Sequence, residues 1–308
     1  MLPSKARSHF RRFAVLGSYG RQFCNTQISH IKSDDPRIRE IGRLIEDDYA
    51  TIRDKYERPR NPVVLAHGLL GFDELHIAGA RLPGLHYWRG ITEALAANGV
   101  ECIVASVPPS GSIETRAARL SECIARKAPG RSVNIIAHSM VGVSPDVILF
   151  QLTAPRGSAF ADFVFQQIGP LHIPKIYKAL EFFGLESDAF SQLTRSYMAK
   201  QFNPATPDDP RVRYYSYGAA FDPYLLSVFR YSHRVIAAEE GANDGMVSID
   251  SSHWGTYKGT LQGASHLDLI NWTNRLRWWF FALGGKKRNF NAVALYLDIA
   301  DMLAKEGL

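Results

Sequence analysis

Short apolar runs alternate with segments of helical spacing along most of this chain. Runs that end in Gly-, Pro- or Ser-containing loops are typical of buried strands. They occur at residues 62–67, 101–107, 132–137 and 212–218, and another begins at Asp146. Between them, apolar positions recur at the period of an amphipathic helix. The pattern predicts one helix that carries Trp88, Ile91 and Leu95 and stops at Gly99, and a second that begins after Ser112 and ends near Pro129.

The alternation of strand and helix predicts a mostly parallel α/β sheet with flanking helices and right-handed crossovers. In such sheets, ligands bind beyond the carboxyl ends of the strands. Two polar clusters fall at those ends, His67-Gly68-Leu69 and His138-Ser139. The sequence therefore places its candidate chemistry at one edge of the predicted sheet.

Three segments flank or interrupt this alternation. Residues 34–60 mix charges with sparse apolar positions and predict an exposed helical lead-in before a main domain at 61–308. Residues 160–203 are aromatic-rich with helical spacing, which predicts a helical insertion. Apolar residues from Phe290 to Leu303 predict a terminal amphipathic helix.

Charge is distributed unevenly. The chain has 46% hydrophobic and 21% charged residues and a net charge of +6, which is ordinary for a globular protein. The basic excess precedes Asp34, where no acidic residue occurs. The basic residues of this segment are Lys5, Arg7, Arg11, Arg12, Arg21 and Lys32. Because residues 34–308 carry no net charge, the composition gives no support to a nucleic-acid partner.

The basic, acid-free segment at residues 1–33 is typical of a mitochondrial targeting peptide. It predicts a protein of the matrix or of the inner-membrane surface. The alternative is a flexible basic tail on a cytoplasmic protein. No apolar run is long enough to predict a transmembrane segment.

A serine, an acid and a histidine suited to nucleophilic catalysis follow one another along the chain. They are Ser139 in AHSMV, Asp244 in GANDGMVS and His266 in GASHLDLINW. A serine hydroxyl is a weak nucleophile until a base takes its proton and a third group orients that base. The order serine, acid, histidine is that of hydrolases whose serine lies on a strand-to-helix turn. Val141 departs from the glycine usual in that turn, and its β-branched side chain crowds the approach of helix and strand.

Several blocks over residues 61–305 together resemble the triacylglycerol lipase family of the α/β-hydrolase fold, of bacterial and fungal type. The fungal branch, including mitochondrially targeted members, is the more similar. The blocks are VVLAHGLLGFDELHIAGARLPGLHYWRG, NIIAHSM, GSAFADF, NDGMVSIDSSHWGTYKGT and SHLDLINWTNRLRWW. The resemblance implies a serine hydrolase of lipid carboxylic esters. It also implies that residues 160–203 form a cap or lid with transient contact to a lipid surface.

The resemblance also implies the role of each site residue. Ser139 corresponds to the nucleophile, Asp244 to the acid and His266 to the general base. The backbone N–H groups of Leu69 and Met140 correspond to the donors of the oxyanion hole.

No cofactor is implied for the chemistry itself. Asp222 and Asp268 correspond to carboxylates that hold a structural calcium ion in bacterial members, and calcium prefers such oxygen ligands. Asp268 has an alternative explanation as a polar residue that caps the histidine loop. His138, next to the nucleophile, is expected to serve packing and not to act as a base.

The connection after the nucleophile is shorter than the fold requires. Parallel neighbouring strands need a crossover of a dozen or more residues, usually a helix, and only residues 140–145 separate Ser139 from Asp146. The crossover helix after the nucleophile is therefore largely missing, as after an internal deletion or a mis-spliced gene model. Two interpretations stay open: an active hydrolase, or a catalytically impaired homologue or truncated isoform with a lipid-binding or no enzymatic role.

The targeting interpretation predicts that residues 1 to about 30 direct import into mitochondria and are removed. A full-length fusion to a fluorescent protein should colocalise with a mitochondrial marker. A fusion that stays diffuse in the cytosol would contradict the interpretation.

Overall fold

The computed structural model describes residues 42–69, 74–75, 85–139, 147–152, 155–166, 191–225, 227–272 and 290–308. The chain divides into two compact units, Met1–Glu40 and Ile41–Leu308, and all described residues belong to the second. The predicted targeting segment lies outside the described residues. No helix in the described part of the chain is long and apolar enough to span a bilayer.

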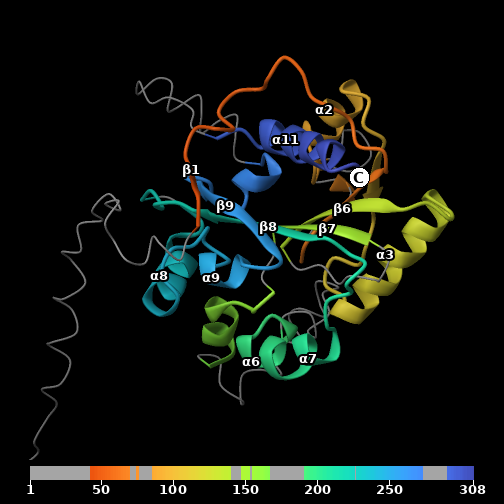
Figure 1. The fold of residues 1–308 in the computed structure, drawn as a ribbon. Helices are drawn as coiled ribbons and strands as arrows, with labels where there is room; N and C mark the ends of the chain where they lie inside the picture. Colours follow the sequence, from red (N-terminus) through yellow and green to blue (C-terminus); the bar gives the residue numbers. More distant parts are fainter. Residues whose placement is uncertain are drawn as a thin grey trace, which may run out of the picture. The chain divides into compact units, whose positions relative to one another are not determined.

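A seven-stranded, fully parallel sheet runs through the second unit (Figure 1), with the order β1-β9-β8-β7-β6-β2-β5. This confirms the predicted parallel α/β sheet. The strands of the sheet are β1 (Leu44–Ile45), β2 (Val63–Ala66), β5 (Cys102–Ala105), β6 (Val133–His138), β7 (Val147–Leu152), β8 (Tyr214–Ala220) and β9 (Thr256–Gln262). A separate antiparallel pair consists of β3 (Glu74–Leu75) and β4 (Leu85–His86).

Helices cover both faces of the sheet. They are α2 (Ile91–Ala97), α3 (Ile113–Lys127), α6 (Arg195–Tyr197), the π-helical η2 (Met198–Phe202), α7 (Asn203–Ala205), α8 (Arg230–Glu239), α9 (Ile249–Ser252), the 3-10 turn η3 (Asp268–Ile270) and α11 (Ala292–Lys305). The predicted helix start at Ser112 is confirmed, because the Ser112 hydroxyl accepts a hydrogen bond from the Thr115 amide at 3.2 Å. The terminal helix begins in the same way at Asn291, whose side-chain oxygen accepts from the Val293 amide.

The strand period of two divides the core into two layers. Alternate residues of β2 face opposite sides, with Val63 and Leu65 packed among α2 and α11, and Val64 and Ala66 packed among the residues of α3. All four are fully buried. Burial on both faces explains why the central strands are continuous apolar runs in the sequence.

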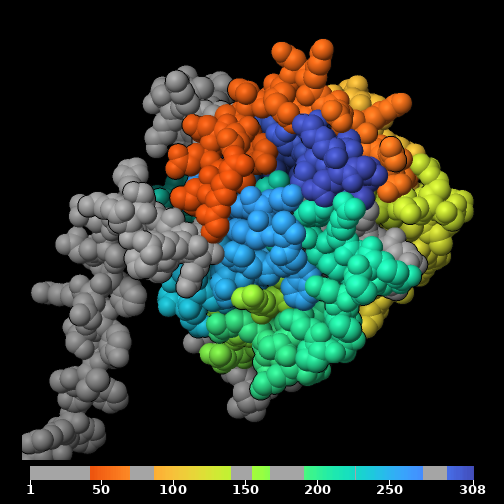
Figure 2. Space-filling model, in the orientation of Figure 1, coloured from red at the N-terminus to blue at the C-terminus, as the bar shows by residue number. Residues whose placement is uncertain are grey.

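The predicted helical lead-in is wrong for the residues that the structure describes. Residues 42–60 hold the short strand β1 and turns, and β1 pairs with β9. Arg53 forms ion pairs with Asp298 and Asp301 of α11, and Asp301 also accepts a hydrogen bond from the Glu57 amide at 2.8 Å. Figure 2 shows this orange segment against the blue residues of β9 and α11. The charged side chain of Arg53 therefore pairs with α11 instead of lying on an exposed helix of its own.

The described parts of the predicted cap are mainly helical. Residues 159–166 form a helical segment, and α6, η2 and α7 continue from 195 to 205. They lie on the side of the sheet opposite α11 (Figure 1). Residues 167–190, the middle of the predicted cap, lie outside the described residues.

The short connection after Ser139 joins strands that are direct neighbours. β6 and β7 pair in parallel from Val133↔Val147 to His138↔Leu152, so the chain must return along the whole length of β6 before β7 begins. The six residues of β6 cover about 20 Å. A helix over the eight steps from Ser139 to Val147 would cover only about 12 Å. The prediction that the crossover helix is missing falls on residues 140–146, which lie outside the described residues.

A family-length helix inserted after Met140, with glycine at position 141, should raise both stability and activity. Each large apolar side chain that such a helix buries contributes about 1.5–3 kcal/mol, against a net stability of about 5–15 kcal/mol. Thermal denaturation and ester hydrolysis of the two proteins would measure the difference. If the unmodified chain melts as high and hydrolyses as fast, the missing helix is without consequence.

Candidate active site

The site lies where the direction of strand addition reverses. From β2 the chain proceeds to β5 on one side, and then returns to β6 on the other side of β2. A crevice forms at such a switch point, beyond the carboxyl ends of the two strands. Ala66 of β2 pairs with Ala137 of β6. The residues that follow, His67-Gly68 and His138-Ser139, are thereby brought together.

Ser139 has the backbone of a sharp, strained turn. Its φ is 64°, in the left-handed region that residues with a Cβ rarely adopt. Strain of this kind persists only where the surroundings impose it, and it is frequent at functional sites. The structure thus places Ser139 on a tight turn at the end of β6, although Val141 stands where glycine is usual.

Gly68 lies directly against that turn. A Cβ added to Gly68 would lie 2.2 Å from the Cβ of Ser139 and 2.6 Å from the carbonyl oxygen of His138. No side chain fits in that space without moving the backbone. The chain can bring the loop after β2 into contact with Ser139 only because residue 68 is glycine.

Polar side chains fix the peptide planes of this loop. The Gly68 carbonyl lies 3.0 Å from His67 Nδ1 and accepts a hydrogen bond if that nitrogen is protonated. In that tautomer, Nε2 of the same ring accepts from the Val107 amide at 3.5 Å. The Gly68 carbonyl and the Leu69 N–H belong to one peptide group. The imidazole of His67 therefore sets the direction of the predicted oxyanion donor at Leu69. Met140, the other predicted donor, lies outside the described residues.

Arg116 of α3 is a buried cation that supports the same loop. Its guanidinium donates to the carbonyl oxygens of His67 and Pro108, and the residue is only 1% exposed. Burial lowers the pKa of Arg116 to about 10, so the group remains charged at neutral pH. Sequence reasoning missed this residue. The available signal was an arginine on the helix face formed by Ile113, Leu120 and Cys123.

Asp244 and His266 form a buried acid–imidazole pair. Asp244 Oδ2 lies 2.7 Å from His266 Nδ1, and the two residues are 3% and 8% exposed. Asp244 Oδ1 accepts hydrogen bonds from the amides of Met246 and Val247 at 2.9 and 2.8 Å. The two amides therefore fix Oδ1 of the carboxylate, and Oδ2 holds the imidazole of His266.

His138, the residue before Ser139, packs its ring against the imidazole of this pair. Its ring centroid is 4.4 Å from that of His266. No hydrogen bond between Ser139 and His266 occurs among the described contacts. Hydrogen bonds of catalytic groups are often long in unliganded proteins and tighten when substrate binds. The structure brings the acid and the histidine into direct contact and places the serine turn beside them.

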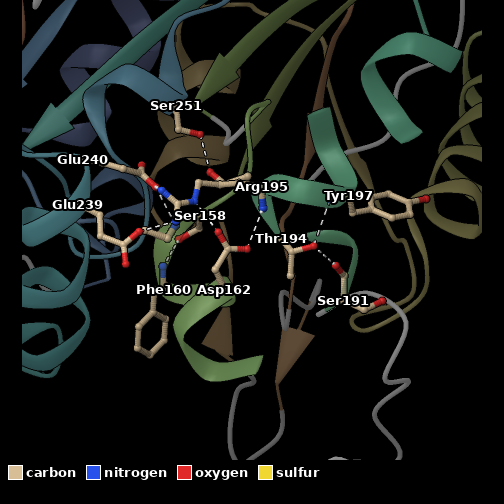
Figure 3. Close-up of polar contacts among 12 residues, drawn as sticks. Ser158, Phe160, Asp162, Ser191, Thr194, Arg195, Tyr197, Glu239, Glu240 and Ser251 are labelled. Atoms are coloured by element: carbon tan, nitrogen blue, oxygen red, sulfur yellow. Dashed lines mark hydrogen bonds and ion pairs between the residues drawn. The ribbon is translucent and has the colours of Figure 1, made fainter. Parts of the chain in front are cut away.

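The base of the cap is tied to the loop that carries Asp244. The Ser158 hydroxyl donates to the Met246 carbonyl at 2.8 Å, and the Ser251 hydroxyl donates to the Gly157 carbonyl at 2.6 Å. Figure 3 shows Ser158 and Ser251 beside the cap. Two residues that follow Asp244, Met246 and Ser251, therefore contact the chain at the start of the cap.

Arg195 holds the two described parts of the cap together (Figure 3). Its Nε lies 2.5 Å from Asp162 Oδ2, and its guanidinium also pairs with Glu239 and Glu240 of the neighbouring α8 segment. The Ala159 amide donates to Glu240 at 2.9 Å. Asp162 holds the pKa of Arg195 above its usual value. The cluster thus anchors the helical segment 159–166 to α6 and α8.

The two carboxylates predicted for calcium lie in different settings. Asp268 is buried, and its carboxylate accepts from the backbone amide and the hydroxyl of Ser265 at 2.9 and 2.7 Å. Asp222 is exposed. Within the described residues, no group of three or more His, Cys, Asp or Glu side chains is placed to hold a metal. These residues therefore do not complete a calcium site by themselves, and calcium stays a prediction.

The sequence of the chain is similar to those of known lipases. No family model matches the chain. The chain is 32% identical to triacylglycerol lipase 2 of Saccharomyces cerevisiae, over 84% of its own length and 96% of that protein. It is 27% identical to a triacylglycerol lipase of Pseudomonas fragi, over 81% of its length and 98% of that protein.

Solved structures agree on the fold. The chain superimposes on the metagenomic carboxyl esterase MGS0156 with a TM-score of 0.60 at 18% identity, covering 83% of this chain and 79% of that one. For the Staphylococcus hyicus lipase the TM-score is 0.56 at 16% identity, over 83% and 98%. These structures share the α/β-hydrolase fold. Since the yeast relative matches at 32% identity over nearly its whole length, the chain belongs to the triacylglycerol lipase family.

Proposed function

We propose that the chain hydrolyses carboxylic esters of lipids, acylglycerols or related compounds, with Ser139 as nucleophile, His266 as general base and Asp244 as the group that orients it. The observation that carries this proposal is the buried Asp244–His266 pair, 2.7 Å between oxygen and nitrogen. It lies beside a serine in the strained backbone conformation of a nucleophile turn.

The proposed ester hydrolysis proceeds in two steps, acylation of Ser139 and hydrolysis of the acyl-serine. His266 takes the hydroxyl proton as Ser139 Oγ attacks the ester carbonyl, which forms a C–O bond and an oxyanion. The oxyanion collapses, the alkoxide leaves with the proton from His266, and an acyl-serine remains. Water, activated by the same histidine, then attacks the acyl carbon and releases the fatty acid and the free serine. Asp244 accepts from Nδ1 throughout and stabilises the imidazolium.

The oxyanion would be bound by main-chain N–H groups of Leu69 and Met140. Loss of one such donor typically costs about 2.7–4 kcal/mol of transition-state stabilisation. The Leu69 peptide is fixed from behind by His67 and Arg116, as described above. Such prior fixation is the basis of electrostatic catalysis, because the donors need not reorganise during the reaction.

A lipid substrate is supported by the names of the relatives and by the surface beside the cap. The two relatives are named triacylglycerol lipases. Four large apolar side chains on one segment are more than half exposed: Tyr224, Leu225, Val228 and Tyr231. The Tyr231 ring also contacts Phe160 and Phe163 at the start of the cap. An apolar surface next to the cap fits transient contact with a lipid surface.

The alternative is a catalytically impaired homologue, and the short connection between β6 and β7 favours it. Misplacement of a reacting group by about 1 Å can cost 10²-fold in rate. Under this alternative the Asp244–His266 pair is intact while the Met140 amide is not held at the oxyanion. The hydrolysis assay below separates the two functions.

Purified protein should hydrolyse a short-chain chromogenic ester, and Ser139→Ala should abolish that activity. In addition, kcat/KM should fall at acid pH, because a protonated His266 cannot accept the serine proton. A folded wild-type protein whose hydrolysis equals that of Ser139→Ala would contradict the proposal and support the impaired homologue. An acid limb that persists unchanged in His266→Ala would remove His266 from the role of base.

Gly68→Ala should abolish hydrolysis, because the added Cβ would meet the Ser139 Cβ and displace the nucleophile or the oxyanion loop. The matched control is Gly130→Ala. Gly130 has a positive φ of 67°, and an added Cβ there meets no atom within 4 Å. Both variants should lose stability, by about 1–3 kcal/mol, but only Gly68→Ala should lose kcat. Equal kcat in both would show that the contact with Ser139 is not required.

A further inference from the structure

A line of buried polar groups connects the loop after β2 to the catalytic histidine. The Tyr87 ring contacts the ring of His67 in that loop, with 5.6 Å between the ring centroids. The Tyr87 hydroxyl lies 2.7 Å from His138 Nδ1, and His138 Nε2 lies 3.1 Å from the carbonyl oxygen of His266. Tyr87 and His138 are 6% and 1% exposed.

The chemistry of the end groups fixes the direction of these bonds. The His266 carbonyl can only accept, so His138 must carry its proton on Nε2. Nδ1 of the same ring is then an acceptor, and the Tyr87 hydroxyl must donate to it. Donation therefore runs one way, from Tyr87 through His138 to the His266 carbonyl.

Burial keeps the two linking groups in the protonation states that this direction requires. It lowers the pKa of His138 well below its usual range, with the nearby His266 as a second cause. It raises the pKa of the Tyr87 phenol. At neutral pH the imidazole is uncharged and the phenol keeps its proton.

This relay includes or contacts residues that are near the proposed oxyanion donor Leu69 and the proposed nucleophile Ser139 in the chain. His67, which Tyr87 contacts, lies two residues before Leu69, and His138 immediately precedes Ser139. The His138 ring also lies against that of His266. A shift in any member moves the oxyanion loop, the nucleophile and the base relative to one another.

We propose that Tyr87 and His138 are positioning residues that couple the oxyanion loop to His266 through this one-way hydrogen-bond relay. The inference rests on the proposed function of Ser139 and His266. Because both ring nitrogens of His138 are engaged, the ring holds the site in place and does not exchange protons with the substrate.

Tyr87→Phe removes one oxygen atom and should lower kcat by about threefold to tenfold with KM unchanged. This range corresponds to the net contribution of a single buried hydrogen bond. The matched control is Tyr296→Phe. Tyr296 is fully buried, its ring packs on Trp88, and its hydroxyl has no hydrogen-bond partner in the described part of the chain. The control should keep kcat, and an equal loss of kcat in both variants would overturn the relay.

The double variant Tyr87→Phe/His138→Phe tests whether the two residues act through the same hydrogen bond. His138→Phe alone should lower kcat further, because it breaks two hydrogen bonds, the one from Tyr87 and the one to the His266 carbonyl. In that background the hydrogen bond between Tyr87 and His138 is already lost, so adding Tyr87→Phe should leave kcat unchanged. Losses that multiply would mean that the residues act separately and would overturn the proposal.

The tautomer gives a test that needs no enzymatic activity. In ¹⁵N–¹H spectra of the histidine side chains, the His138 signal is assigned by its absence from His138→Gln. It should report a neutral ring with the proton on Nε2, and its Nδ1 shift should change in Tyr87→Phe. A proton on Nδ1 would overturn the relay whether or not the protein hydrolyses esters. The expected tautomer in a protein that lacks hydrolysis would overturn the proposed function alone.

Discussion

The site depends on how closely two backbones approach at the ends of β2 and β6. Gly68 touches Ser139 so tightly that a single methyl group would force them apart. The parallel register of the two strands places these residues side by side, and Ser139 has the left-handed backbone of a tight turn. This contact sets how far the proposed nucleophile Ser139 lies from the loop that carries the proposed oxyanion donor at Leu69.

Buried polar groups hold the contact in place from three directions. Arg116 binds the carbonyl before Gly68, and the Tyr87 ring packs against the ring of His67. His138 extends this support to the carbonyl of His266. Burying a polar group destabilises the folded protein unless that group forms hydrogen bonds there. A network of this kind therefore permits few alternative arrangements and makes the site rigid, while the cap is tied to the acid loop by Ser158.

The fold was largely predictable, because buried parallel strands are apolar on both faces and stand out as runs in the sequence. β9 was missed because Lys258, Gly259 and Thr260 interrupt its apolar pattern. The lead-in was misread because its charges pair with α11, which no local pattern reveals. The burial of Arg116 was open to prediction from its place on the apolar face of α3, but its partners, and those of Tyr87, were not, because only the folded sheet brings them together.

The most direct test of the account is peptide mapping by mass spectrometry after reaction with a long-chain alkyl fluorophosphonate. Such a reagent modifies a serine only where a base activates it and donors bind the developing oxyanion. If Ser139 is the activated nucleophile, one adduct per chain forms on the peptide that contains Ser139, and none forms in Ser139→Ala. A folded protein that remains unmodified, or that carries the adduct on another residue, would contradict the account.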